Sequence, residues 1–96
     1  MKDDARKTAL ELLKVRIDRA GNLRDAYLIA RIDADIEGLA HNGIHLTDST
    51  SDILLLVDYC AWRYNNRDKA DDMPKWLRLL RRERWLSDRR IQEETV

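Results

Sequence analysis

The sequence predicts an all-α fold: a small bundle of about four helices followed by a frayed C-terminal tail. Three observations lead to this prediction: apolar residues recur at helical spacing, only three glycines and one proline occur in 96 residues, and phenylalanine is absent. A β-sandwich or barrel needs more turn residues and more β-branched or aromatic residues. The length is enough for one domain and too short for two packed ones.

The first two helices are expected over residues 4–16 and 23–41. The first has a broad apolar face made of Ala5, Ala9, Leu10, Leu12, Leu13 and Ile17. A turn over 18–22 separates them, with Gly21 able to adopt a positive φ and Asn22 able to cap the second helix. The second helix has a heavy aliphatic face of Leu28, Ile29, Ile32, Ile36 and Leu39, and a lighter face of Leu23, Ala26, Tyr27, Ala30 and Ala34. Asn42-Gly43 is a common helix stop, with the glycine just past the end.

The third helix is expected over 52–66, with Ser49 or Ser51 as its cap. Its main apolar stripe consists of Ile53, Leu56, Val57, Cys60 and Tyr64. A second stripe, almost opposite, consists of Leu55, Tyr59 and Trp62. A helix that is apolar on two sides must be covered on both. The second stripe must therefore meet the first helix, the fourth helix or a neighbouring subunit.

The fourth helix is expected over 74–89, after a polar loop over 67–72, because proline is favourable in a first helical turn. Its core-side face is expected to be Trp76, Leu77, Leu79, Leu80 and Leu86. On the other face, Trp85 projects among Arg78, Arg81, Arg82 and Arg89. Residues 91–96 show no periodicity and are expected to form a flexible tail, which leaves residues 1–90 as a single domain.

The charge is balanced overall but unevenly distributed, with 18 basic and 18 acidic side chains. Residues 31–58 contain six acids and one base, whereas residues 75–90 contain seven bases and two acids. Opposite poles suit head-to-tail self-association or a partner with charged patches. Chance segregation of charge, which is common in helical proteins, remains an equal alternative at this point.

Catalytic chemistry finds little support in the sequence, and we expect no enzyme activity, no cofactor and no metal site. Cys60 lies in an apolar stripe, typical of a core thiol. His41 and His45 are four residues apart, but Asn42-Gly43 breaks the helix between them and nothing completes a ligand set. No apolar run approaches the ~20 residues of a membrane span, and the acidic start is unlike a signal peptide. The single cysteine excludes an internal disulfide and fits a reducing compartment.

The outer face of the fourth helix is the most informative cluster, because Trp and Arg are enriched at interface hot spots. The candidate interface residues are Arg78, Arg81, Arg82, Trp85, Arg89, Arg90, Leu55, Tyr59 and Trp62. One alternative is a solvated basic helix end with Trp85 folded back on its own chain. Another is a small nucleic-acid-binding regulator, since arginines hold phosphates and an indole stacks on a base. A pI of about 6.7 and the acidic middle of the chain argue against it.

Two segments resemble the small head-tail connector (head completion, or adaptor) proteins of tailed bacteriophages and prophages. The first is Leu10-x-x-Leu13-Lys14-x-x-Ile17-Asp18, followed by a short loop, Asp25 and a long helix with Ile32 and Ile36. The second is the aromatic-rich segment 58–68, which ends in Tyr-x-x-Arg and is followed by a polar loop and Met73-Pro74-x-Trp76-Leu77. The resemblance covers about residues 8–90, and the order and spacing of the two segments carry it.

This resemblance implies a structural protein of the virion head-tail junction, present in the host cytoplasm during assembly. Such proteins form a ring, commonly dodecameric, beneath the portal protein, and the ring extends the DNA channel. DNA passes through without sequence recognition, and the ring offers a surface to a downstream tail or neck protein. They are not enzymes and need no cofactor. The family's docking segment around and beyond the last helix corresponds to about residues 85–96, which here is short and carries Glu93 and Glu94.

Overall fold

The computed structural model describes residues 1–17, 25–66 and 72–94, with the side chains described as far as residue 90. It contains four helices in the described residues and no strand: α1 (Asp3–Arg16), α2 (Asp25–His41), α3 (Thr50–Asn65) and α4 (Lys75–Glu94). The predicted all-α class and four-helix organisation are confirmed. The turn predicted over 18–22, most of the loop predicted over 67–72 and the last two residues of the predicted tail lie outside the described residues.

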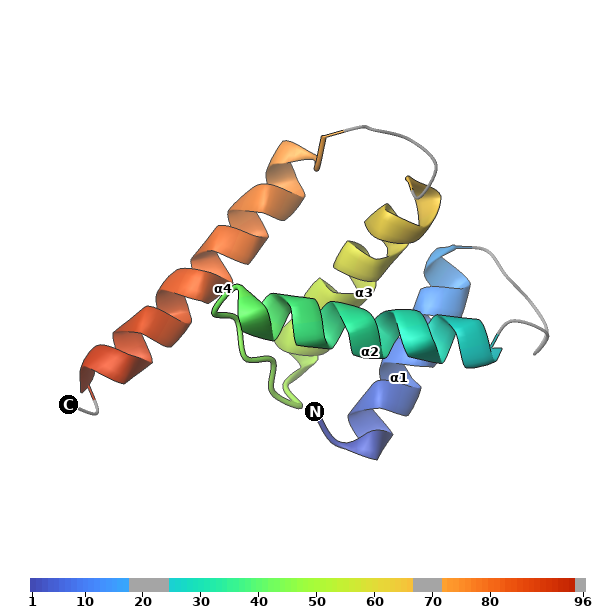
Figure 1. Cartoon of the computed structure of the whole chain (residues 1–96), viewed down its shortest axis with the longest axis horizontal. Coiled ribbons are helices and arrows are strands. Elements are labelled where there is room, and N and C mark those ends of the chain that lie inside the picture. Colours follow the sequence, from blue (N-terminus) through green and yellow to red (C-terminus); the bar gives the residue numbers. More distant parts are fainter. Residues whose placement is uncertain (18–24, 67–71, 95–96) are drawn as a thin grey trace.

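Figure 1 shows α2 crossing over α1 and α3, while α4 lies beside α3 on the side away from α1. The molecule measures 46 × 31 × 19 Å. Its shortest dimension corresponds to about two helix diameters, so the helices form only two layers. In such a thin arrangement each helix is covered on part of its circumference, and one side of every helix remains exposed to solvent.

The core lies where α1, α2 and α3 meet. The main stripe of α3 is buried as predicted. The expected faces of α1 and α2 are also mostly buried, through Ala5, Ala9, Leu10, Leu13, Leu28, Ile32 and Leu39. Leu12 and Ile29, which were predicted on the same faces, are exposed. Both stand at the edge of their stripe, beyond the reach of the neighbouring helix in a two-layer bundle.

The loop between α2 and α3 begins and ends with defined caps. At the end of α2, the Ile44 amide donates to the Leu39 carbonyl at 2.8 Å and the Gly43 amide donates to the Ala40 carbonyl at 3.0 Å. This is a Schellman end, and Gly43 supplies the positive φ of 90° that it requires. At the start of α3, the Ser49 side chain accepts a hydrogen bond from the Asp52 amide at 3.2 Å. Ser49, rather than Ser51, is therefore the cap.

The predicted core side of α4 is wrong for four of its five residues. Only Leu77 is buried, whereas Trp76, Leu79, Leu80 and Leu86 are exposed. Within the described residues α4 packs against α3 and the loop after α2, and against neither α1 nor α2 (Figure 1). The five apolar residues spread over half the circumference of the helix, which is more than one neighbour can cover. The helix reaches Glu94, beyond the end expected at Arg89.

The second stripe of α3 is covered within the chain. Leu55 and Tyr59 are buried, and Trp62 is partly buried against the core. Part of the cover comes from α4, because the guanidinium carbon of Arg81 lies 5.9 Å from the centre of the Tyr59 ring. The structure thus confirms the fourth helix as one of the elements that cover this stripe. Leu55 and Tyr59 were predicted as interface residues, but both are buried within the chain.

Candidate interface on α4

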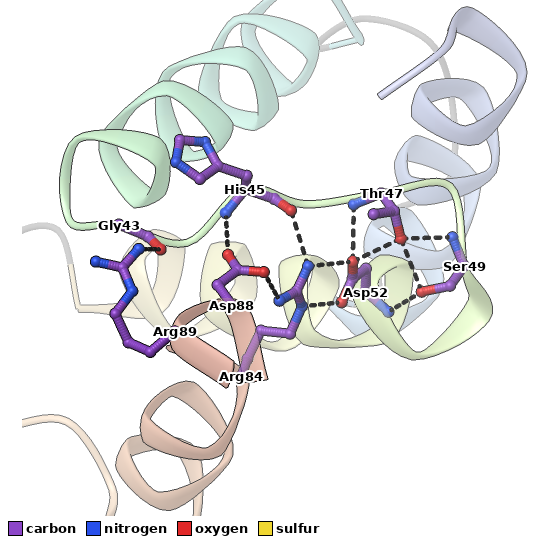
Figure 2. A network of polar contacts seen from close by, with 8 residues as sticks. All are labelled: Gly43, His45, Thr47, Ser49, Asp52, Arg84, Asp88 and Arg89. Atoms are coloured by element: carbon purple, nitrogen blue, oxygen red, sulfur yellow. Dashed lines mark hydrogen bonds and ion pairs between the residues drawn. The ribbon is translucent and has the colours of Figure 1, made fainter. Parts of the chain in front are cut away.

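A polar network holds α4 against the rest of the chain, and we call it the Arg84 network: Arg84, Asp52, Asp88, Thr47 and the backbone of His45. Figure 2 shows Arg84 reaching from α4 between the two carboxylates. Its Nε donates to Asp52 Oδ1 at 2.7 Å, its Nη2 donates to the His45 carbonyl at 2.8 Å, and its Nη1 pairs with Asp88. Side chains and backbone of three separate segments therefore converge on one guanidinium group.

Both carboxylates of the Arg84 network have further donors. Asp88 accepts from the His45 amide at 2.8 Å. Asp52 Oδ2 accepts from the Thr47 amide at 2.7 Å and from the Thr47 hydroxyl at 2.8 Å. Burial opposes the charged forms, but the hydrogen bonds from Arg84 and Thr47 outweigh it and lower the pKa of Asp52. Burial is likewise outweighed at Asp88, whose pKa is lowered by the His45 amide and by Arg84. Both groups are therefore ionised at neutral pH.

A second contact joins α4 to Gly43, in the loop just after α2. Arg89 Nη2 donates to the Gly43 carbonyl at 3.1 Å, and the Arg89 guanidinium carbon lies 5.1 Å from the centre of the Trp85 ring. A Cβ placed on Gly43 would lie 3.0 Å from Trp85 Nε1, so the indole rests directly on this glycine. Trp85 is 38% exposed. One part of the ring packs on its own chain, and the rest remains open to a partner.

Beside Trp85 lies a shallow hollow of about 300 Å³, which we call the Trp85 hollow. It is lined by Asn42, Ile44, Arg78, Arg81, Arg82 and Trp85. Arg78 and Arg82 are exposed. Arg81 is partly buried, and its Nε has no hydrogen-bond partner among the described residues. Three guanidinium groups and an indole around one hollow suit a ligand that combines negative charge with a flat or apolar group.

The predicted interface residues thus fall into three groups. Arg78, Arg81, Arg82 and Trp85 come together at the Trp85 hollow, with Arg89 stacked on the indole. Arg90 is exposed on α4 outside the hollow. Leu55, Tyr59 and Trp62 lie on α3 as described above and do not line it. The Trp85 hollow therefore gathers most of the α4 candidates and none of the three α3 candidates, and the role of all of them as an interface stays a prediction.

Sequence reasoning missed two groups of polar residues. The first is the Arg84 network, for which the i, i+4 spacing of Arg84 and Asp88 was the only local signal. The second is Asp35, which is buried between α2 and α3. Its Oδ1 lies 3.4 Å from Arg63 Nε, and its Oδ2 has no hydrogen-bond partner in the described part of the chain. Asp35 lies next to Ile36 on a face expected to be apolar. Its spacing from Leu28, Ile32 and Leu39 places it in their buried stripe, but a search for apolar residues passes over an acid.

Cys60 is a buried free cysteine on α3. Burial, followed by the nearby charge of Asp35, raises the pKa of the Cys60 thiol, which favours the unreactive protonated form. In the described part of the chain, no three residues of the His, Cys, Asp and Glu types gather closely enough to hold a metal ion. Likewise, none of the helices in that part combines the length and apolar character that crossing a membrane would require.

Comparisons of the chain with protein-family models, with curated proteins and with solved structures find nothing that matches it.

Proposed function

We propose that this chain is a structural subunit of a phage or prophage head-tail connector. Its copies assemble as a ring on the portal vertex, extend the DNA channel and offer a platform for a tail or neck protein. The resemblance over residues 8–90 suggests this function. The observation that carries it physically is the Trp85 hollow, because an exposed indole among arginines is the surface chemistry of a protein-binding hot spot.

The chemistry of the Trp85 hollow defines the partner surface that it fits. Arg78 and Arg82 can each grip a carboxylate through two parallel hydrogen bonds. The exposed part of the Trp85 ring, held in place by Gly43 and Arg89, can cover an apolar or aromatic side chain next to that carboxylate. An acidic segment of the portal protein that carries one large apolar residue therefore satisfies both halves of the site.

The test is binding to the portal ring encoded in the same genome, measured by light scattering and followed by electron microscopy. We expect Trp85→Ala to keep its helix content and to weaken portal binding by about 30-fold, the equivalent of about 2 kcal/mol for a hot-spot residue. Tyr27→Ala is the matched control, because Tyr27 is an exposed aromatic residue on α2, away from the hollow. Absence of portal binding by the unmodified chain contradicts the proposal, and so does unchanged binding by Trp85→Ala.

A small nucleic-acid-binding regulator is the second candidate, and the grouping of Arg78, Arg81 and Arg82 beside an indole favours it. Salt separates the two functions. Three phosphate contacts give a slope of about −2.7 in log affinity against log salt concentration for a duplex. A connector subunit shows no useful affinity for duplex DNA at any moderate salt concentration. A filter-binding titration with a short duplex at several salt concentrations decides between them.

A further inference from the structure

The side of α4 that points away from the body of the chain carries an apolar ridge with a basic border. Leu79 and Leu86 are 49% and 41% exposed and stand seven residues apart, so they lie two turns from each other on one face. Lys75, Arg82 and Arg90 fall on the same face at spacings of three or four residues and are exposed. The ridge formed by these five residues is therefore an amphipathic docking surface with a formal charge of +3 from its three bases.

A groove lies between α3 and α4, with a volume of about 530 Å³. Its apolar lining comes from Leu54, Leu55 and Leu80, of which Leu54 and Leu80 are exposed. Its polar lining comes from Ser51, Asp52, Asp58, Glu83, Arg84 and Ser87. Three acids against one base give this lining a formal charge of −2; Asp52 is paired with Arg84, and Asp58 Oδ1 lies 3.7 Å from Arg16 Nε, which offsets part of that charge. The groove thus offers an apolar floor and an acidic border, the inverse of the ridge.

The ridge and the groove of one chain cannot meet. At about 100° per residue, Leu79 and Leu86 point to a different side of α4 from Leu80 and Ser87, which face the groove. A groove that is apolar at its floor and acidic at its border fits an amphipathic helix with leucines at i and i+7 and bases beside them. Such a helix is present in every other copy of the chain.

We propose that the groove between α3 and α4 binds the Leu79–Leu86 ridge of a second copy of this chain. Because two different surfaces meet, the contact is heterologous, and repeating it yields a closed ring or an open filament. This inference rests on the self-association in the proposed function and assigns it to particular residues. It leaves Trp85 and Arg78 free for the portal protein, because both lie on a third side of α4, whereas Arg82 borders both the ridge and the Trp85 hollow and serves one partner at a time.

The experiment uses two variants and one control, each followed by sedimentation across a concentration series up to about 1 mM. Leu54→Lys places a cation in the groove, and Leu86→Glu places an anion on the ridge. Both residues are exposed, at 48% and 41%, so circular dichroism should show unchanged helix content. We expect each variant alone to weaken self-association at least about tenfold. Val15→Glu, at an exposed position on α1, is the control and should associate like the unmodified chain.

Mixing the two variants gives the decisive measurement. The Leu54→Lys copy retains an intact ridge and the Leu86→Glu copy retains an intact groove, so an equal mixture should regain association and form at least a pair of twice the chain mass. Variants that associate normally overturn the inference, and so does a mixture that stays at the mass of one chain. An unmodified chain that remains monomeric at about 1 mM also overturns it. The portal-binding measurement decides the proposed function separately.

Discussion

Replacement of Arg84 by alanine should strongly destabilise the docking of α4. The Arg84 side chain is only 16% exposed, and its carboxylate partners Asp52 and Asp88 are 5% and 11% exposed. Breaking a buried ion pair from one side costs about 3–5 kcal/mol, because the remaining charge stays buried without compensation. Here Asp52 keeps two hydrogen bonds from Thr47, and Asp88 keeps the one from the His45 amide. We therefore expect a loss of about 2–4 kcal/mol in the free energy of unfolding.

Urea unfolding followed by circular dichroism and by tryptophan fluorescence measures this loss, since α4 carries two of the three tryptophans. Arg84→Lys keeps the charge but not the planar fork that meets two acids at once, so an intermediate loss is expected. Arg82→Ala removes an exposed arginine from the same helix and should change stability by no more than about 0.5 kcal/mol. A loss below about 1 kcal/mol for Arg84→Ala would refute the reasoning, because it would show that water replaces the guanidinium without cost.

Three further outcomes follow from the packing and the charges. Leu56→Ala should cost about 2–5 kcal/mol in chemical unfolding, and a loss under about 1 kcal/mol would contradict the complete burial of Leu56. Gly43→Ala should cost at least about 1–2 kcal/mol by the same measurement, because φ is 90° there and the new methyl group meets Trp85; equal stability would show that the turn can rearrange. Stability should also fall in acid, because the pKa values of Asp52 and Asp88 are lower in the folded chain than the unfolded value of about 3.9. The stabilisation that these two ionised carboxylates provide is complete above that value and is lost as the pH falls through their folded pKa values. A pH series of unfolding curves checks this, and Asp52→Asn should reduce the acid-dependent loss; an identical slope would exclude Asp52 as its source.

The helices around the core could be predicted from the sequence because their signals are local. The stripe of α3 from Ile53 to Tyr64 repeats at helical spacing, and each of its residues is buried. The stop at Gly43 is likewise local, because the Schellman end depends on one residue that tolerates a positive φ. The choice of Ser49 over Ser51 as the cap was not determined, because either serine stands close to the first turn of α3.

The docking side of α4 could not be predicted from its apolar pattern. The residues that face the body are Leu77, Arg84 and Asp88, at i, i+7 and i+11, which is one stripe of a helix. Two of these three are charged, so a search for apolar periodicity passes over them and selects the exposed leucines. The partner acid Asp52 is 32 residues away in sequence, and no local rule connects it with Arg84. The grouping of the arginines and the indole at the Trp85 hollow could be predicted from the sequence because these residues share one helix.

The loop between α2 and α3 forms its hydrogen bonds with α4 through main-chain atoms. These are the carbonyl of Gly43 and both the amide and the carbonyl of His45. Every amino acid carries a carbonyl, and every one except proline carries an amide hydrogen. The hydrogen bonds that anchor the helix can therefore persist when the residue at position 45 changes, whereas they require the side chains of the Arg-x-x-x-Asp pair on the helix. Distant homologues should be sought by that pair together with an acid in the first turn of the preceding helix, even where the intervening loop has diverged beyond alignment.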